Sequence, residues 1–182
     1  LRVNSLRWGL DNWIYGAAGG HHPGFANTTT ISSAATGRQV QLGSRDFRFH
    51  PASRVLDPQS GPSQFGRVRD DWGQWYGVQN SFPLWHYVLA DPYLRRNPDV
   101  PAPDARRQLR PPANPRVYPK KPAEKRYHSF EQTGRFTSAC GPDIYRDELL
   151  FARSETVHAF TCEPFHNVVQ HHVLARDGPS FR

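Results

Sequence analysis

The 182-residue sequence contains no methionine and only two cysteines. Apolar residues never follow one another for about 18 positions, so the sequence predicts no transmembrane helix. The first residues also lack the basic, apolar and small-residue segments of a signal peptide. Because the chain opens without an initiator Met, on the strand-like residues 1–6, we expect an interior fragment of a longer protein. An aromatic content of 13% argues against a disordered chain, which would be poor in aromatics.

Positive charge is concentrated in one part of the chain. The sequence has 23 Lys and Arg against 16 Asp and Glu, a formal net charge of +7. Residues 95–126 hold ten basic residues and only three acidic ones, so this segment accounts for the entire net charge. Only Tyr118 and Tyr127 lie near it as stacking surfaces for bases, so we expect a solvated segment and no nucleic-acid partner.

Prolines are concentrated in the same region. Nine of the 17 prolines lie at residues 92–122, and each one fixes φ and removes a backbone donor. This predicts a Pro-rich basic linker or inserted loop at residues 92–126, through which neither a helix nor a strand ladder runs. The folded regions are then residues 1–91 and residues 127–182.

Both flanking regions have an all-β pattern of short aromatic and β-branched runs separated by turn residues. Residues 9–12 predict a tight hairpin, because Asp and Asn tolerate the left-handed conformation. Residues 46–50 predict a strand with Phe47 and Phe49 on one face and Arg48 and His50 on the other. Further along, residues 160–163 and 167–174 predict an antiparallel pair, and a short helical turn is expected only at residues 147–151.

One pattern recurs along the chain: a strand end, a Gly-containing turn and an aromatic strand. It lies at residues 8–16, at residues 72–77 and, more faintly, at residues 140–145, with offsets of 64 and 68 residues. A compact propeller blade has about 40–50 residues, so each offset fits one blade with inserted loops. The repeat therefore predicts a partial β-propeller of about three blades.

Several motifs together resemble a known family; they are residues 6–16, 43–49, 63–66, 70–73, 80–87 and 138–141. Over nearly the whole chain, the sequence resembles the propeller region of the membrane-bound dehydrogenases of planctomycete-type bacteria. These are large exported proteins, many of which carry a c-type haem domain. More distantly, the chain is similar to the six-bladed propeller of quinoprotein glucose and sorbosone dehydrogenases, which have a Gly-Pro-Asp-Gly hairpin in the place of residues 9–12.

The resemblance implies a fragment of an exported quinoprotein-like dehydrogenase, located in the periplasm, outside the cell or at the membrane through other parts of the protein. Such an enzyme would oxidise sugars or alcohols with pyrroloquinoline quinone and Ca²⁺ and pass electrons to a haem domain. This chain has no Cys-x-x-Cys-His motif, so the haem would lie outside it. The resemblance also implies a disulfide between Cys140 and Cys162 on adjacent strands, worth about 3 kcal/mol.

Three positions depart from the quinoprotein pattern. The family's catalytic His corresponds to a position near Leu1, and its quinone-binding Arg and Asn correspond to positions near Pro62 and Ser63. This difference favours a second hypothesis, a non-catalytic propeller that binds a carbohydrate or a protein partner through aromatic side chains. The candidates are Trp75, Tyr76, Trp85 and Tyr87, although an aromatic strand of this kind equally predicts a core strand.

One histidine is a candidate general base. Strand alternation places His86 on the face opposite Trp85 and Tyr87, and an unperturbed imidazole with a pKa of about 6.5 suits proton transfer. The alternative is a hydrogen-bonded core histidine. Asp70 and Asp71 carry oxygens that Ca²⁺ prefers, but no calcium-loop spacing accompanies them. We therefore expect them to cap a turn.

The remaining histidines predict no metal site. His171 and His172 are neighbours on one strand and point to opposite faces, and His166 lies about 20 Å from His172 along a straight strand. No set of three or four ligands converges on these residues or on the pair His21 and His22. Asp11, in the first hairpin, is expected to be structural.

Overall fold

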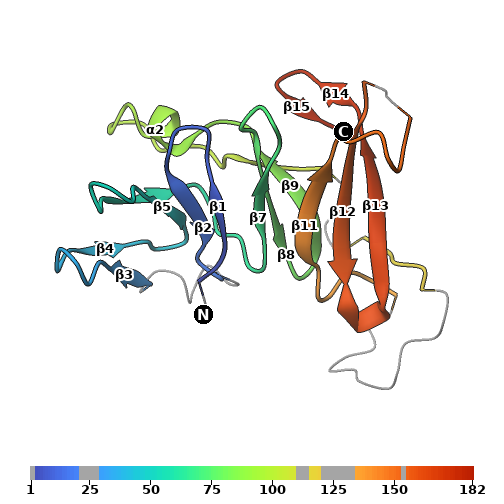
Figure 1. Cartoon of the computed structure of the whole chain (residues 1–182), viewed down its shortest axis with the longest axis horizontal. Helices are drawn as coiled ribbons and strands as arrows, with labels where there is room; N and C mark the ends of the chain where they lie inside the picture. The colour runs from blue at the N-terminus through green and yellow to red at the C-terminus, as the bar shows by residue number, and fades with distance from the viewer. Residues whose placement is uncertain (1–2, 21–28, 110–114, 120–133, 153–154) are drawn as a thin grey trace.

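The computed structural model describes residues 3–20, 29–109, 115–119, 134–152 and 155–182 (Figure 1). This part of the chain is all-β, as the sequence predicts, and consists of antiparallel sheets that do not close into a barrel. The three larger sheets stand side by side, and β7, the first strand of the middle sheet, packs against both β1 and β11, the first strands of the other two. Within these residues, no helix has the length and apolar character needed to cross a membrane.

Sheet 1 is a four-stranded antiparallel sheet in the order β1-β2-β5-β6. Its strands are β1 (Asn4–Trp8), β2 (Ile14–Ala17), β5 (Asp46–Phe49) and β6 (Leu56–Gln59), and a separate hairpin of β3 (Thr30–Ser32) and β4 (Gln39–Gln41) is inserted after β2. The expected turn between β1 and β2 is confirmed, with Asn12 at a φ of 61°. The strand expected at 46–50 is also confirmed and ends at Phe49, and Phe47 is buried with Phe49 packed against its cluster.

Sheet 2 has the order β10-β9-β8-β7. Its strands are β7 (Arg67–Arg69), β8 (Trp75–Gln79), β9 (Phe82–Tyr87) and β10 (Arg106–Gln108), and the short helix α2 (Asp91–Leu94) follows β9. The prediction that prolines exclude helix and ladder from residues 92–126 is wrong at α2 and at β10. Pro92 lies in the first turn of α2, where its missing N–H is not needed. The three residues of β10 lie in a stretch without proline and pair with β9.

Sheet 3 has three strands, β11 (Cys140–Tyr145), β12 (Val157–Glu163) and β13 (Val168–Leu174), with the 3-10 turn η2 (Pro164–His166) between the last two. The hairpin of β14 (Arg176–Asp177) and β15 (Ser180–Phe181) follows. The predicted antiparallel pair is confirmed as β12 and β13. The predicted helical turn at 147–151 is wrong: Leu149 and Leu150 are 88% and 62% exposed, so a turn there would have no buried face to stabilise it.

The repeated pattern occupies equivalent places only in its first two copies. Residues 9–13 and 70–74 are the turns that join the first two strands of sheets 1 and 2, whereas the third copy coincides with strand β11 itself. The apolar core between sheets 2 and 3 is built on Tyr76, Leu84, Leu174 and Phe181. The opposite face of sheet 2 buries Trp85 and Tyr87. Strand alternation therefore places Leu84 of β9 in one interface and Trp85 and Tyr87 in the other.

Candidate functional site

A cleft of about 380 Å³ lies at the end of the sheets where the β1–β2 turn, the β7–β8 turn and the start of α2 come together. Figure 1 shows these three segments at the same end of the molecule. Asp11, Trp72 and Asp91 contribute from the turns and the helix, and Tyr15, Arg67 and Trp75 contribute from the strands. Residues from both sides of the junction between sheets 1 and 2 therefore meet here.

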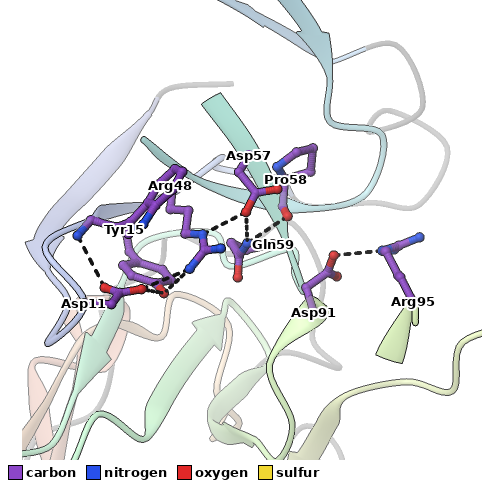
Figure 2. Close-up of polar contacts among 9 residues, drawn as sticks. Asp11, Tyr15, Arg48, Asp57, Pro58, Gln59, Asp91 and Arg95 are labelled. Atoms are coloured by element: carbon purple, nitrogen blue, oxygen red, sulfur yellow. Dashed lines mark hydrogen bonds and ion pairs between the residues drawn. The ribbon is translucent and has the colours of Figure 1, made fainter. Parts of the chain in front are cut away.

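Arg48 does not line the cleft itself but binds two side chains of one of its walls, Asp11 and Tyr15, as Figure 2 shows. Its Nη1 donates to Asp11 Oδ2 at 2.9 Å and to the Tyr15 hydroxyl at 3.0 Å, and its Nε donates to Asp57 Oδ2 at 2.8 Å. The Tyr15 hydroxyl donates to Asp11 Oδ2 at 2.8 Å. Burial, followed by this bond to the Asp11 carboxylate, raises the pKa of Tyr15. Tyr15 therefore remains a neutral phenol that holds Asp11 in place.

An amide next to this group and a second carboxylate continue the lining of the cleft. Gln59 Nε2 donates to Asp57 Oδ2 at 3.0 Å and to the carbonyl of Pro58 at 2.9 Å. Asp91 accepts from the Ser60 hydroxyl at 3.1 Å, and its other oxygen accepts from Arg95 Nε at 2.8 Å. Every carboxylate of the cleft is thus paired with a guanidinium.

The floor of the cleft is a buried ion pair that joins sheets 1 and 2. Arg67, only 3% exposed, donates through Nη1 to Asp46 Oδ2 at 2.8 Å and to the Ser60 carbonyl at 2.6 Å. Asp46 is fully buried and also accepts from the backbone amides of Ala18 and Ser63 at 3.0 and 2.9 Å. The Arg67 Nε is buried without a hydrogen-bond partner among the described residues.

Aromatic rings surround this guanidinium. The Arg67 guanidinium carbon lies 4.3 Å from the Tyr87 ring centre, 5.2 Å from that of Trp75 and 5.7 Å from that of Tyr15. Tyr15 and Trp75 pack against each other with ring centres 4.2 Å apart. At the rim, Trp72 is 56% exposed, with the Arg146 guanidinium 3.3 Å from its ring. The cleft therefore combines flat apolar surfaces with hydrogen-bonding groups.

The aromatic residues proposed as a binding surface have mostly internal positions. Tyr76, Trp85 and Tyr87 are 0%, 2% and 6% exposed, as their alternative interpretation as core residues predicts. Trp75 is half-buried and lines the cleft together with Tyr87. The functional candidates that the sequence did not single out are Trp72 and the two arginines, Arg48 and Arg67.

His86 lies where β9 reaches the cleft, but it is only 2% exposed. Its Nδ1 is 2.9 Å from the Ser180 hydroxyl, and its ring packs between Tyr76 and Phe181. Burial, together with the charges of Arg176 and Arg107, lowers the pKa of His86 to about 4. The imidazole is therefore neutral near pH 7, while its role as a general base stays a prediction.

The positions that correspond to the quinone-binding residues of the family, and the aspartates considered for Ca²⁺, do not fit these groups. Asp70 accepts from the backbone amides of Trp72 and Gln74 at 3.0 and 2.9 Å, which confirms its predicted role in a turn. Ser63 is fully buried, with its hydroxyl 2.7 Å from that of Tyr87. Across the part of the chain that the structure describes, no three His, Cys, Asp or Glu side chains are grouped to hold a metal ion. Leu1 lies outside the described residues.

The histidines of sheet 3 are arranged differently from the sequence-based prediction. His172 faces the interior at 8% exposure, opposite to the half-buried His171, as alternation predicts. His166 is buried and lies 3.5 Å from Glu163. The unexpected contact is between His158 Nδ1 and His171 Nε2, which are 3.0 Å apart. His21 and His22 lie outside the described residues.

Cys140 and Cys162 face each other in the register of β11 and β12, and both are free thiols. Burial and the nearby Cys162 raise the pKa of the Cys140 thiol. Directly opposed residues of antiparallel strands have Cα atoms about 4.5–5.5 Å apart, within the range of a disulfide. The placement is compatible with the pairing implied by the resemblance, which stays a prediction.

Comparisons with known proteins leave the activity open. The model of one family, described as a domain of unknown function (DUF7133), matches residues 1–182. No curated protein matches the chain significantly. No solved structure matches it significantly either.

Proposed function

The chain belongs to the DUF7133 family, a domain of unknown function, and we propose that its cleft binds a neutral carbohydrate. The observation that carries the proposal is the floor of the cleft, where a buried Arg67 Nε without a partner lies among three aromatic rings. A buried donor is costly when it has no acceptor, so a ligand oxygen at this point is favourable. A sugar offers such oxygens together with apolar ring faces that pack on aromatic side chains.

The charges of the cleft favour a neutral ligand over an acidic or basic one. Asp11 and Asp57 share Arg48, Asp46 pairs with Arg67, and Asp91 pairs with Arg95. A charged ligand would have to compete with one of these pairs, and the cost is greatest at the buried pair of Asp46 and Arg67. Hydroxyl groups instead accept from Arg67 and donate to carboxylate oxygens without breaking a pair.

The proposal includes a partial β-propeller as the scaffold. Sheets 1 and 2 each have four antiparallel strands, and sheet 3 has three, with the first strand of each sheet next to that of its neighbour. This order supports three blades around a common axis, with the cleft at one end of the blades. An exported location is part of the same proposal, because the dehydrogenases that the sequence resembles are exported.

Binding is tested by calorimetry of the purified chain with neutral and acidic mono- and oligosaccharides. Trp72→Ala and Trp8→Ala form a matched pair, since both tryptophans are 56% exposed and only Trp72 lines the cleft. Loss of about 40 Å² of apolar contact is worth about 1 kcal/mol, so Trp72→Ala should weaken binding about fivefold. Trp8→Ala should bind like the unsubstituted chain. Equal losses in both variants, or a preference for acidic sugars, would contradict the proposal.

The second candidate function is oxidation of the sugar or alcohol bound in the same cleft. Its support is the neutral imidazole of His86, which lines the cleft and has the protonation state of a general base. The chain's own residues do not fit the quinone and Ca²⁺, so no electron-transfer step is derived. Addition of pyrroloquinoline quinone and Ca²⁺ to the full-length protein tests this candidate. Dye reduction with a sugar or alcohol would support it, and the absence of quinone binding would remove it.

A further inference from the structure

The outer edges of the three larger sheets differ in how well they are protected. The first strands of the sheets lie next to one another, so β6, β10 and β13 are the strands at the opposite edges. An edge strand presents unpaired backbone N–H and C=O groups, and natural proteins protect such edges with proline, charged side chains or very short strands. The residues of each edge strand therefore show whether another strand can pair with it.

The edges of sheets 1 and 2 are protected. Strand β6 has only four residues, which include Asp57 and Pro58. Strand β10 has only three residues, of which two are arginines. The backbone N–H of Arg106 in this strand already donates to Asp104 Oδ1 at 2.9 Å. Neither strand offers a long, uncharged row of backbone groups to another chain.

Strand β13 has none of these protective features. It is seven residues long and contains no proline, glycine, lysine, arginine, aspartate or glutamate. Among the described residues it pairs on one side only, with β12, and Figure 1 shows it as the outermost strand of sheet 3. Its Val169 and Val173 side chains are 63% and 55% exposed. A long, uncharged edge strand of this composition favours pairing with another strand.

The sequence of β13 is self-complementary in the antiparallel direction. Its seven residues, Val-Val-Gln-His-His-Val-Leu, are apolar at both ends and polar in the middle. In antiparallel pairing about a two-fold axis at His171, Val169 lies opposite Val173 of the second copy. Each apolar residue then faces an apolar one and each polar residue a polar one, and β-branched pairs of this kind stabilise a sheet. Burial and the neighbouring His158 lower the pKa of His171, so the two imidazoles at the axis do not repel each other near pH 7.

We infer that β13 is a dimerisation edge, at which two copies of this chain pair in antiparallel register about His171. The two three-stranded sheets then form one continuous sheet of six strands, and the contact is isologous, so it closes as a dimer. The strands are short and bury a small area. The contact therefore belongs to the small, transient class of interfaces, and we expect the dimer to form at about 0.1–1 mM chain.

The dimerisation edge is independent of the carbohydrate cleft. The cleft is lined from sheets 1 and 2, the start of α2 and the β14–β15 turn, whereas the edge belongs to sheet 3. Failure of either proposal therefore leaves the other unaffected.

Sedimentation equilibrium of the purified chain tests the edge at concentrations of about 0.01–1 mM, over which the unsubstituted chain should change from monomer to dimer. Val169→Lys combined with Val173→Lys places like charges opposite each other in two cross-strand pairs, and should weaken association at least about tenfold. Val169→Lys combined with Val173→Glu places opposite charges in the same two pairs and should restore association. Val100→Lys changes a valine outside sheet 3 that is 56% exposed, and should leave association unchanged.

Cysteine cross-linking tests the register in a chain carrying Cys140→Ala and Cys162→Ala. His171→Cys places two thiols opposite each other at the axis, where the Cα atoms of paired strands are about 4.5–5.5 Å apart, within the range of a disulfide. Val173→Cys is the matched control, because its two thiols lie four residues apart along the joined strands, about 14 Å. Circular dichroism of each variant establishes that sheet content is unchanged.

A disulfide-linked dimer of the His171→Cys chain, with none from the Val173→Cys chain, would support the inference. A monomer at every concentration, a dimer that Val169→Lys with Val173→Lys leaves intact, or equal cross-linking of the two cysteine variants would overturn it.

Discussion

The buried ion pair between Asp46 and Arg67 allows a direct test of what holds sheets 1 and 2 together. Asp46→Asn removes the carboxylate that accepts from Arg67, Ala18 and Ser63, and leaves a guanidinium that is 3% exposed without its counter-charge. Breaking a buried pair on one side costs about 3–5 kcal/mol. Since a domain is stable by about 5–15 kcal/mol, this loss is large enough to lower the urea midpoint clearly.

The chain offers a control with the same shortest nitrogen–oxygen distance and different burial. Asp104 and Arg106 are also 2.8 Å apart, but their side chains are 57% and 32% exposed. Asp104→Asn should therefore cost about 1 kcal/mol or less, because exposed pairs contribute little. Urea unfolding of both variants, followed by tryptophan fluorescence and circular dichroism, gives the comparison. If Asp46→Asn were destabilised no more than Asp104→Asn, burial would not be what makes this pair important.

Two further predictions concern titration and redox state. The pKa of His86 is lowered to about 4, so below about pH 6.5 the unfolded chain takes up a proton that the folded chain does not. Stability should therefore fall as the pH falls from about 6.5 to about 4.5, by about 2 kcal/mol more in the unsubstituted chain than in His86→Gln, and equal pH profiles in urea unfolding would contradict this. Oxidation with oxidised glutathione should join Cys140 to Cys162 and stabilise the chain by about 3 kcal/mol, and a mass unchanged after oxidation would refute the pairing.

The elements predicted correctly are those whose signals are local. The Asp-Asn turn before β2 and the alternation of Phe47 and Phe49 depend only on neighbouring residues, and both were confirmed. The sequence does not predict strand β10, because the many prolines of the segment 92–126 indicate that no strand ladder runs through any part of it. Pairing needs only three consecutive backbone donors and acceptors without proline, which Arg106–Gln108 supply.

The candidate sites were less predictable because their residues meet only through pairing between strands and sheets. Asp46 and Arg67 belong to different sheets, and no local pattern indicates that they form one ion pair. Along a single strand, alternation separates His171 from His172, so the sequence alone shows no pair of histidines on one face. His158 lies on the preceding strand, and the register of β12 and β13 brings it next to His171.

The Asp46 carboxylate has a consequence for hydrogen exchange. It binds the amide hydrogens of Ala18, at the end of β2, and of Ser63, in the segment leading to β7, and it also holds Arg67 of sheet 2. Opening either amide to solvent requires the same carboxylate to move, and this movement would also release the guanidinium. The amides of Ala18 and Ser63 therefore share one opening reaction, and sheets 1 and 2 lose their protection together as one cooperative unit.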